Sequence, residues 1–295
     1  MKAIYKPISA VLPGLFFMCI GQYASAGYCR DLYTQSRAAS KSVIKVSGAT
    51  KYESADLRKL IPEMHENELQ HFREPPRLEI RLHGQITGFF PAEGQLALET
   101  QAVPISKSSR GLNPLLNHEY GHVVFYENFS NFSHEWKWVM SDYAVKGRMK
   151  SPNKAANYKV FAELDHISES YQEFFSDLVT AVRSGNPEVI RDALNEAGLL
   201  SPFNENRSFL KKIPIENWNE EDPHRALAPL YSHVWEVYTS RERTNQQKAD
   251  FLWEIFEIIG EEILDRHKNG LMVMPPAEMN RRFLERLELR MAGPR

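Results

Sequence analysis

The chain has 295 residues, which is enough for one large domain or for two lobes with sizeable cores. Hydrophobic residues make up 42% of it and charged residues 25%, as is typical of a soluble globular protein. The formal net charge is −2 and no basic tail or arm is present, so we expect no nucleic-acid partner.

The first 26 residues have the pattern of a secretory signal peptide. Lys2 and Lys6 supply the positive start, residues 8–20 are mostly apolar, and Ala24-Ser25-Ala26 offers a small-residue cleavage site. The apolar run is shorter than the roughly 20 residues that a membrane span needs. We therefore expect cleavage after residue 26, export to the periplasm or the medium, and no stable membrane span afterwards. An uncleaved N-terminal anchor is the alternative.

Only two cysteines are present, and Cys19 would leave with the signal peptide. Cys29 would then be unpaired in the mature chain, so no internal disulfide is expected to hold the fold together.

Residues 54–72 have helical spacing of apolar side chains and predict a helix. This segment carries His65 and His71, and neither has a partner at ligand spacing, so both are interpreted as surface residues. Residues 78–82 and 95–100 alternate apolar with polar side chains and predict two half-buried strands. Turn residues lie between them, which favours an antiparallel hairpin.

The most informative stretch is residues 113–125, which contains His118-Glu119-Tyr-Gly-His122. Asn113 as N-cap and Pro114 at the first helical position predict a helix. Two histidines four residues apart share one face of a helix and can bind one metal ion together. The alternative is a buried helix with two hydrogen-bonded histidines.

One Zn²⁺ ion suits two neutral imidazoles and a carboxylate, with a fourth position left for a water whose pKa falls to about 7. Glu119 follows the first histidine and can reach that water, so it is predicted to be the general base.

A third protein ligand has to come from elsewhere, and the predicted helix over residues 161–183 offers it. Glu173 is the chosen ligand, because Asp177 lies one turn further on and can accept the other ring N–H of a ligand histidine. Glu169 and His166 are the alternative ligands. The acidic residues of this helix also fit a merely solvated face.

An amide hydrolase needs a further donor for the oxyanion that develops in the reaction, and His224 is the best candidate. It follows a turn-like Asp222-Pro223 and precedes a helix predicted to begin near Pro229, and Asp222 could hold its ring. Three nearby residues compete for the role: His233, Tyr231 and Arg225. Two further helices are predicted, one over residues 245–268 and one after Pro275-Pro276.

Three motifs resemble the thermolysin-like zinc metallopeptidases, the gluzincin clan: His118-Glu-Tyr-Gly-His122, Glu173-Phe-Phe-Ser-Asp177 and Asp222-Pro-His224. Residues 88–98 also resemble the edge strand that borders the substrate cleft in that family. The resemblance spans about residues 78–240, although the interval before Glu173 is longer than in thermolysin and no clear calcium loops are present.

The resemblance implies zinc bound by His118, His122 and Glu173, with Glu119 as general base. It also implies that Asp177 orients a ligand histidine and that His224 stabilises the transition state.

The predicted fold class is α+β. A mixed α/β lobe with an antiparallel edge hairpin covers residues 27–160, a mainly helical lobe covers residues 161–295, and the zinc helix lies in the cleft between them. The predicted function is that of an exported zinc-dependent metallopeptidase acting on a peptide or protein substrate, which could pair with the strand at residues 96–100. The alternatives are a zinc-dependent amide hydrolase acting on cell-wall peptides, or a catalytically inactive binding protein with a relic site.

Overall fold

The computed structural model describes residues 43–47, 51–75, 77–82, 88–92, 95–100, 114–129, 132, 152–196 and 205–292. The predicted signal peptide, both cysteines and Asn113 lie outside these ranges. Residues Lys41–Arg295 form one unit. Its elements in chain order are β1 (Val43–Ser47), α3 (Lys51–Asn67), β2 (Arg77–Leu82), β3 (Gly88–Ala92), β4 (Gln95–Thr100), α4 (Pro114–Phe129), α6 (Pro152–Ser184), α7 (Val189–Glu196), α8 (Ala228–Thr239), α9 (Asn245–Lys268) and α10 (Pro276–Ala292).

The predicted α+β fold with two lobes is wrong, because the described part of the chain is mainly helical. Seven helices of 8 to 33 residues account for most of it, whereas none of the described strands exceeds six residues. α6 also runs without a break across residue 160, where the two lobes were expected to meet. The helix predicted at residues 161–183 is confirmed as part of α6, and the one predicted at residues 245–268 is confirmed as α9.

The four strands form one small sheet in the order β1-β2-β4-β3. β1, β2 and β4 are parallel, with Leu78 opposite Leu96, so the predicted hairpin between residues 78–82 and 95–100 is wrong. The antiparallel partner of β4 is β3, with Gly88 opposite Glu99. β4 is therefore paired on both sides and has no free edge to accept a substrate peptide, which overturns that expectation as well.

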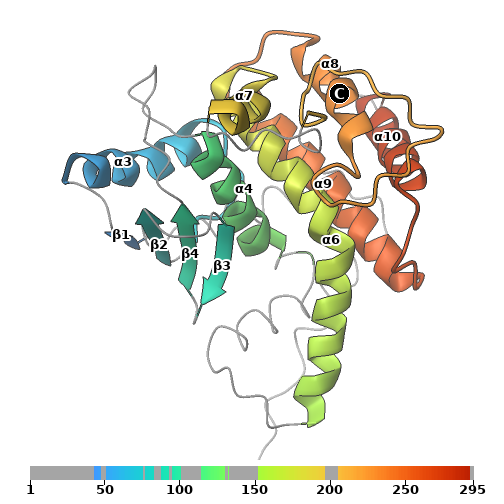
Figure 1. Cartoon of the computed structure of the whole chain (residues 1–295), viewed down its shortest axis with the longest axis horizontal. Helices are drawn as coiled ribbons and strands as arrows, with labels where there is room; N and C mark the ends of the chain where they lie inside the picture. The colour runs from blue at the N-terminus through green and yellow to red at the C-terminus, as the bar shows by residue number, and fades with distance from the viewer. Residues whose placement is uncertain are drawn as a thin grey trace, which may run out of the picture. The chain divides into compact units, whose positions relative to one another are not determined.

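Helix α4 occupies the centre of the fold. It contacts β3 and β4 on one side and α6 and α7 on the other, as Figure 1 shows. Almost every residue of α4 is buried, and apolar side chains lie all around it, as in helices that are enclosed by other elements. Helix α4, which carries His118 and His122, is thus held in place on several sides.

Aromatic rings fix the contact between α4, α6 and α9. The Phe125 ring lies 6.0 Å from that of Phe175, and both lie about 5.5 Å from the ring of Phe256 on α9 (5.5 and 5.4 Å). Phe72 packs 5.6 Å from Phe175 on the same cluster. Such pairs add to the burial of large apolar area, so this cluster holds the two site helices against each other.

His65 and His71 are buried at 3% and 6% exposure, so their interpretation as surface residues is wrong. His65 Nε2 lies 2.7 Å from the Tyr120 hydroxyl on α4, and His71 Nε2 lies 2.6 Å from Asp250 Oδ1 on α9. Both partners are distant in sequence, and so no local spacing could have indicated them.

Among the residues that the structure describes, no helix combines the length and the apolar character required to cross a bilayer.

Candidate metal centre

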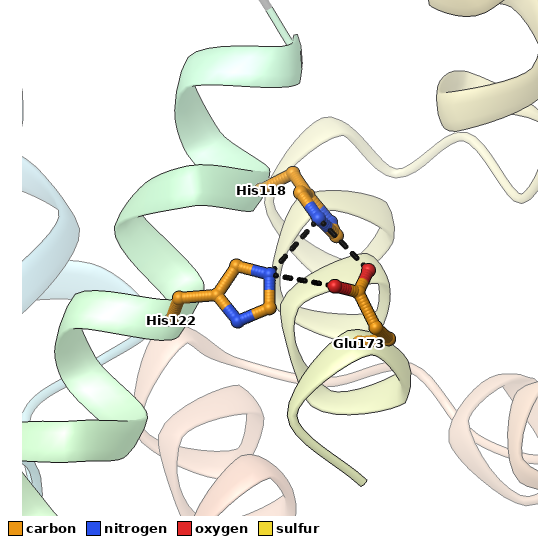
Figure 2. Close-up of side chains that lie close together, drawn as sticks. All are labelled: His118, His122 and Glu173. Carbon is orange, nitrogen blue, oxygen red and sulfur yellow. Dashed lines mark hydrogen bonds and ion pairs between the residues drawn. The ribbon is translucent and has the colours of Figure 1, made fainter. Parts of the chain in front are cut away.

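His118 and His122 lie one turn apart on α4 and point toward α6 (Figure 2). Their Nε2 atoms are 3.2 Å apart, and the two residues are buried at 6% and 9% exposure. A hydrogen bond between two ring nitrogens at this distance requires that one of them carries a proton and the other does not. A shared cation would use the lone pairs of both.

Glu173 on α6 completes the cluster. Its Oε2 lies 3.3 Å from His118 Nε2 and its Oε1 lies 3.3 Å from His122 Nε2. The ligand atoms of the three residues all lie within 4.8 Å of one another, close enough to hold one metal ion. The alternative ligands Glu169 and His166 are both exposed.

The separations fit a small tetrahedral ion. With zinc–ligand bonds of about 2.0–2.2 Å, tetrahedral geometry puts neighbouring ligand atoms roughly 3.3–3.6 Å apart. The observed separations of 3.2 and 3.3 Å between His118, His122 and Glu173 are close to that range. Two imidazoles and one carboxylate are also the donor set of many catalytic zinc sites.

Asp177 lies one turn beyond Glu173 and fixes the ring of His118. Its Oδ1 is 2.8 Å from His118 Nδ1, and its side chain is completely buried. Arg207 donates from Nε to Oδ2 at 2.9 Å and from Nη2 to Oδ1 at 2.6 Å, and Tyr231 donates its hydroxyl to Oδ2 at 2.7 Å. The Asp177 carboxylate is thereby fully enclosed by donors, as a buried charge requires.

These contacts set the charges of the metal-free cluster. Burial alone would raise the pKa of Asp177, but Arg207 and His118 outweigh it and hold that pKa well below its usual range. Burial likewise opposes ionisation of Glu173, yet His122 and His118 lower its pKa well below the ordinary value.

Burial lowers the pKa of His118, but the charge of Asp177 and the hydrogen bonds that the protonated ring donates to Asp177 and Glu173 prevail and raise it to about 10. A metal-bound imidazole must be neutral, so a metal ion would displace this proton.

Glu119, the predicted general base, lies between the two histidines in sequence and is buried at 8% exposure. Glu119 lies on α4, the same helix as the two histidines. His224, by contrast, reaches the cluster from the loop before α8. His224 Nε2 lies 3.5 Å from Glu173 Oε2, and its side chain is 47% exposed.

Asp222 holds His224 as the sequence suggested. Its Oδ1 accepts the backbone N–H of His224 at 2.9 Å and lies 3.1 Å from His224 Nδ1, which leaves Nε2 directed at the cluster. Among the competing candidates, Arg225 pairs with Glu220 at 2.7 Å, Tyr231 bonds to Asp177, and His233 is exposed in a groove between α8 and α10.

Sequence reasoning missed Arg207 altogether. It lies in the segment between α7 and α8, and no local pattern links it to Asp177, from which it is 30 residues distant. Tyr231 was considered only as a competitor of His224, not as a donor to Asp177. The stacked rings of Phe209 and Tyr231, 4.5 Å apart, bring the Arg207 segment and α8 together.

Comparison with protein-family models, with curated proteins and with solved structures found no match to this chain. The likeness to the gluzincins therefore rests on the three motifs and on the stretch at residues 88–98.

Proposed function

We propose that this chain is an exported zinc-dependent metallopeptidase. The observation that carries the proposal is the convergence of His118 Nε2, His122 Nε2 and the Glu173 carboxylate at separations of 3.2–3.3 Å. Glu119, which follows His118 in the sequence, and the half-exposed His224 supply the groups that peptide hydrolysis needs beyond a metal. Export is supported by the signal-like pattern of residues 1–26.

Bound Zn²⁺ would supply Lewis acidity toward the scissile carbonyl and lower the pKa of a water. The Glu119 carboxylate takes a proton from the attacking water and passes it to the leaving nitrogen. His224 donates from Nε2 to the oxygen on which negative charge develops. Because Nδ1 faces Asp222, Nε2 carries a proton to donate only when the ring is an imidazolium.

The two sides of the cluster differ in their access to solvent. The ligand side chains are nearly enclosed, whereas the side chains of His224 and Asp222 are 47% and 40% exposed. A substrate therefore approaches from the side of this loop, and the buried Asp177 network stays dry behind the ligands.

The test combines metal analysis with hydrolysis assays on casein, short peptides and muropeptides, using wild type, Glu119→Gln and the control Glu66→Gln. Glu66 is an exposed acid on α3, so its amide variant should match wild type. We expect one zinc per chain in all three proteins, and a loss of about 10²–10⁴-fold in peptide hydrolysis in Glu119→Gln alone. A chelator should abolish the wild-type activity and added zinc restore it.

The remaining outcomes separate the alternatives. Hydrolysis of muropeptides alone would identify a cell-wall amide hydrolase. Stoichiometric zinc without hydrolysis of any amide substrate would identify a binding protein, and a wild-type chain that binds no zinc would refute the metal centre itself.

A further inference from the structure

Helices α4 and α6 pack closely against each other at Gly121 and Ser176, next to the metal cluster in sequence. A Cβ added to Gly121 would lie 2.6 Å from Ser176 Cα and 2.9 Å from its Cβ and Oγ. Contacts this short with a backbone atom cannot be relieved by turning a side chain. Glycine inside a helix is also less favourable than alanine by about 1 kcal/mol, so the contact is the reason that no side chain is present.

The crossing lies at the level of the ligands. Gly121 immediately precedes His122, and Ser176 lies three residues after Glu173 and directly before Asp177. His118 and His122 come from one helix and Glu173 from the other (Figure 2). The distance between the helices at this point therefore sets the distance between the imidazoles and the carboxylate.

We propose that Gly121 is a positioning residue whose missing side chain sets the α4–α6 spacing at which His118, His122 and Glu173 share one small ion. The inference rests on the metal centre of the proposed function. Ordinary contact begins at 3.4 Å, so a methyl group at position 121 has to open the present 2.6 Å by 0.8 Å. Zinc sites keep their ligand distances to within about ±0.2 Å, so this displacement exceeds what the site tolerates.

A matched control lies in the same fold. Gly260 is a buried glycine inside α9, and a Cβ there would meet the Phe132 ring at 3.2 Å. The substitution is again glycine to alanine in a packed helix, but the neighbour is a side chain, and α9 contributes no ligand. Gly260→Ala therefore reports the general effect of the change on stability.

The experiment titrates the metal-free full-length chain with Zn²⁺ and with the larger Cd²⁺ in competition with a chelator. Circular dichroism shows which variants are folded. We expect Gly121→Ala to lose about 100-fold in zinc affinity, at the upper end of what displaced supporting groups cost, and to lose less for Cd²⁺. The ratio of zinc to cadmium affinity should fall about tenfold, and Gly260→Ala should keep the wild-type ratio.

An unchanged ratio in folded Gly121→Ala, or equal losses for both metals, would overturn the inference. If Gly121→Ala does not fold, it is combined with Ser176→Gly, which removes the two contacts at 2.9 Å. That double variant should fold with a zinc-to-cadmium ratio below that of wild type, because the 2.6 Å contact with the Cα of residue 176 remains. Failure of the double variant to fold, or a wild-type ratio in it, overturns the inference too.

Metal binding is measured here without catalysis. A wild type that binds zinc but hydrolyses nothing refutes the peptidase and leaves this inference standing. A wild type that binds no zinc refutes both.

Discussion

The two walls of the metal cluster are built in different ways. The helix wall, formed by His118 and His122 of α4 and Glu173 and Asp177 of α6, is buried and enclosed by aromatic packing. The loop wall, residues 205–227 before α8, brings Arg207 and His224 to the same place.

Individual hydrogen bonds hold the end of the loop wall. The Trp218 indole N–H donates to the carbonyls of Arg225 and Ala226 at 3.2 and 3.1 Å, and the Asn280 side chain donates to the carbonyl of Ala226 at 2.8 Å. Removing one member of a buried charge network lowers the free energy of unfolding strongly, whereas losing a contact in an exposed turn changes it little. Substitutions in the helix wall should therefore reduce stability, and those at the exposed end of the loop wall should reduce turnover.

The largest effect on stability is expected from Asp177→Asn. It leaves the buried Arg207 guanidinium with only its longer carboxylate contact, to Glu173 Oε2 at 3.5 Å, and breaking a buried pair costs about 3–5 kcal/mol. Urea unfolding of the metal-free chain measures it. Asp192→Asn is the control, since that carboxylate is 53% exposed and lies 3.9 Å from Arg191, and it should change stability by less than about 0.5 kcal/mol. Equal effects of the two substitutions would refute the charge balance of the helix wall.

Acid should remove the stability that the ionised Asp177 carboxylate contributes. The folded-state pKa of Asp177 lies below its unfolded value of about 3.9. A lowered folded-state pKa adds stability above the unfolded pKa, and this stability is lost as the pH falls from there toward the folded pKa. The difference in unfolding free energy between wild type and Asp177→Asn should therefore shrink as the pH falls below about 4. A difference that stays constant down to pH 3 would contradict this.

The difference between the walls also explains what could be predicted from the sequence. His118 and His122 share a helix face, and Glu173 and Asp177 are one turn apart, because helical periodicity is a local property. Arg207 comes from a loop, and its contact with Asp177 exists only once α7, α8 and the loop between them are in place.

The strands show the same limit. Alternation at residues 78–82 and 95–100 indicated two strands correctly, but it carries no information on which strand is the neighbour. β3 took the antiparallel position that was expected of β2. Similarly, His65 and His71 lacked a local partner because their partners, Tyr120 and Asp250, lie on other helices.

A smaller loss of stability is expected from Tyr231→Phe. This variant sharpens the comparison, because Tyr231 lies on α8 but donates a hydrogen bond to Asp177 in the helix wall. The change deletes the 2.7 Å hydrogen bond to Asp177 Oδ2 and leaves the ring in place, so it should cost about 1.5–3 kcal/mol, as hydrogen bonds to charged groups do. Combined with Asp177→Asn it should cost less than the sum of the two, since both remove the same interaction. Strict additivity in urea unfolding would show that Tyr231 acts independently of Asp177.

The smallest effect on stability is expected from Asp222→Asn in the loop wall. The new amide oxygen can still accept the backbone N–H of His224, which lies 2.9 Å from Asp222 Oδ1 in the wild-type chain. The turn should therefore persist, and the free energy of unfolding should change by less than about 0.5 kcal/mol. The charged carboxylate 3.1 Å from His224 Nδ1, which orients the ring, is nevertheless lost, so kcat should fall about tenfold, or about 1.4 kcal/mol of transition-state stabilisation, at unchanged zinc content. Asp222→Ala, which removes both contacts, should lower kcat further. If Asp222→Asn instead loses zinc, or destabilises the chain as much as Tyr231→Phe, then the loop wall also determines the metal geometry, and the division between the two walls is wrong.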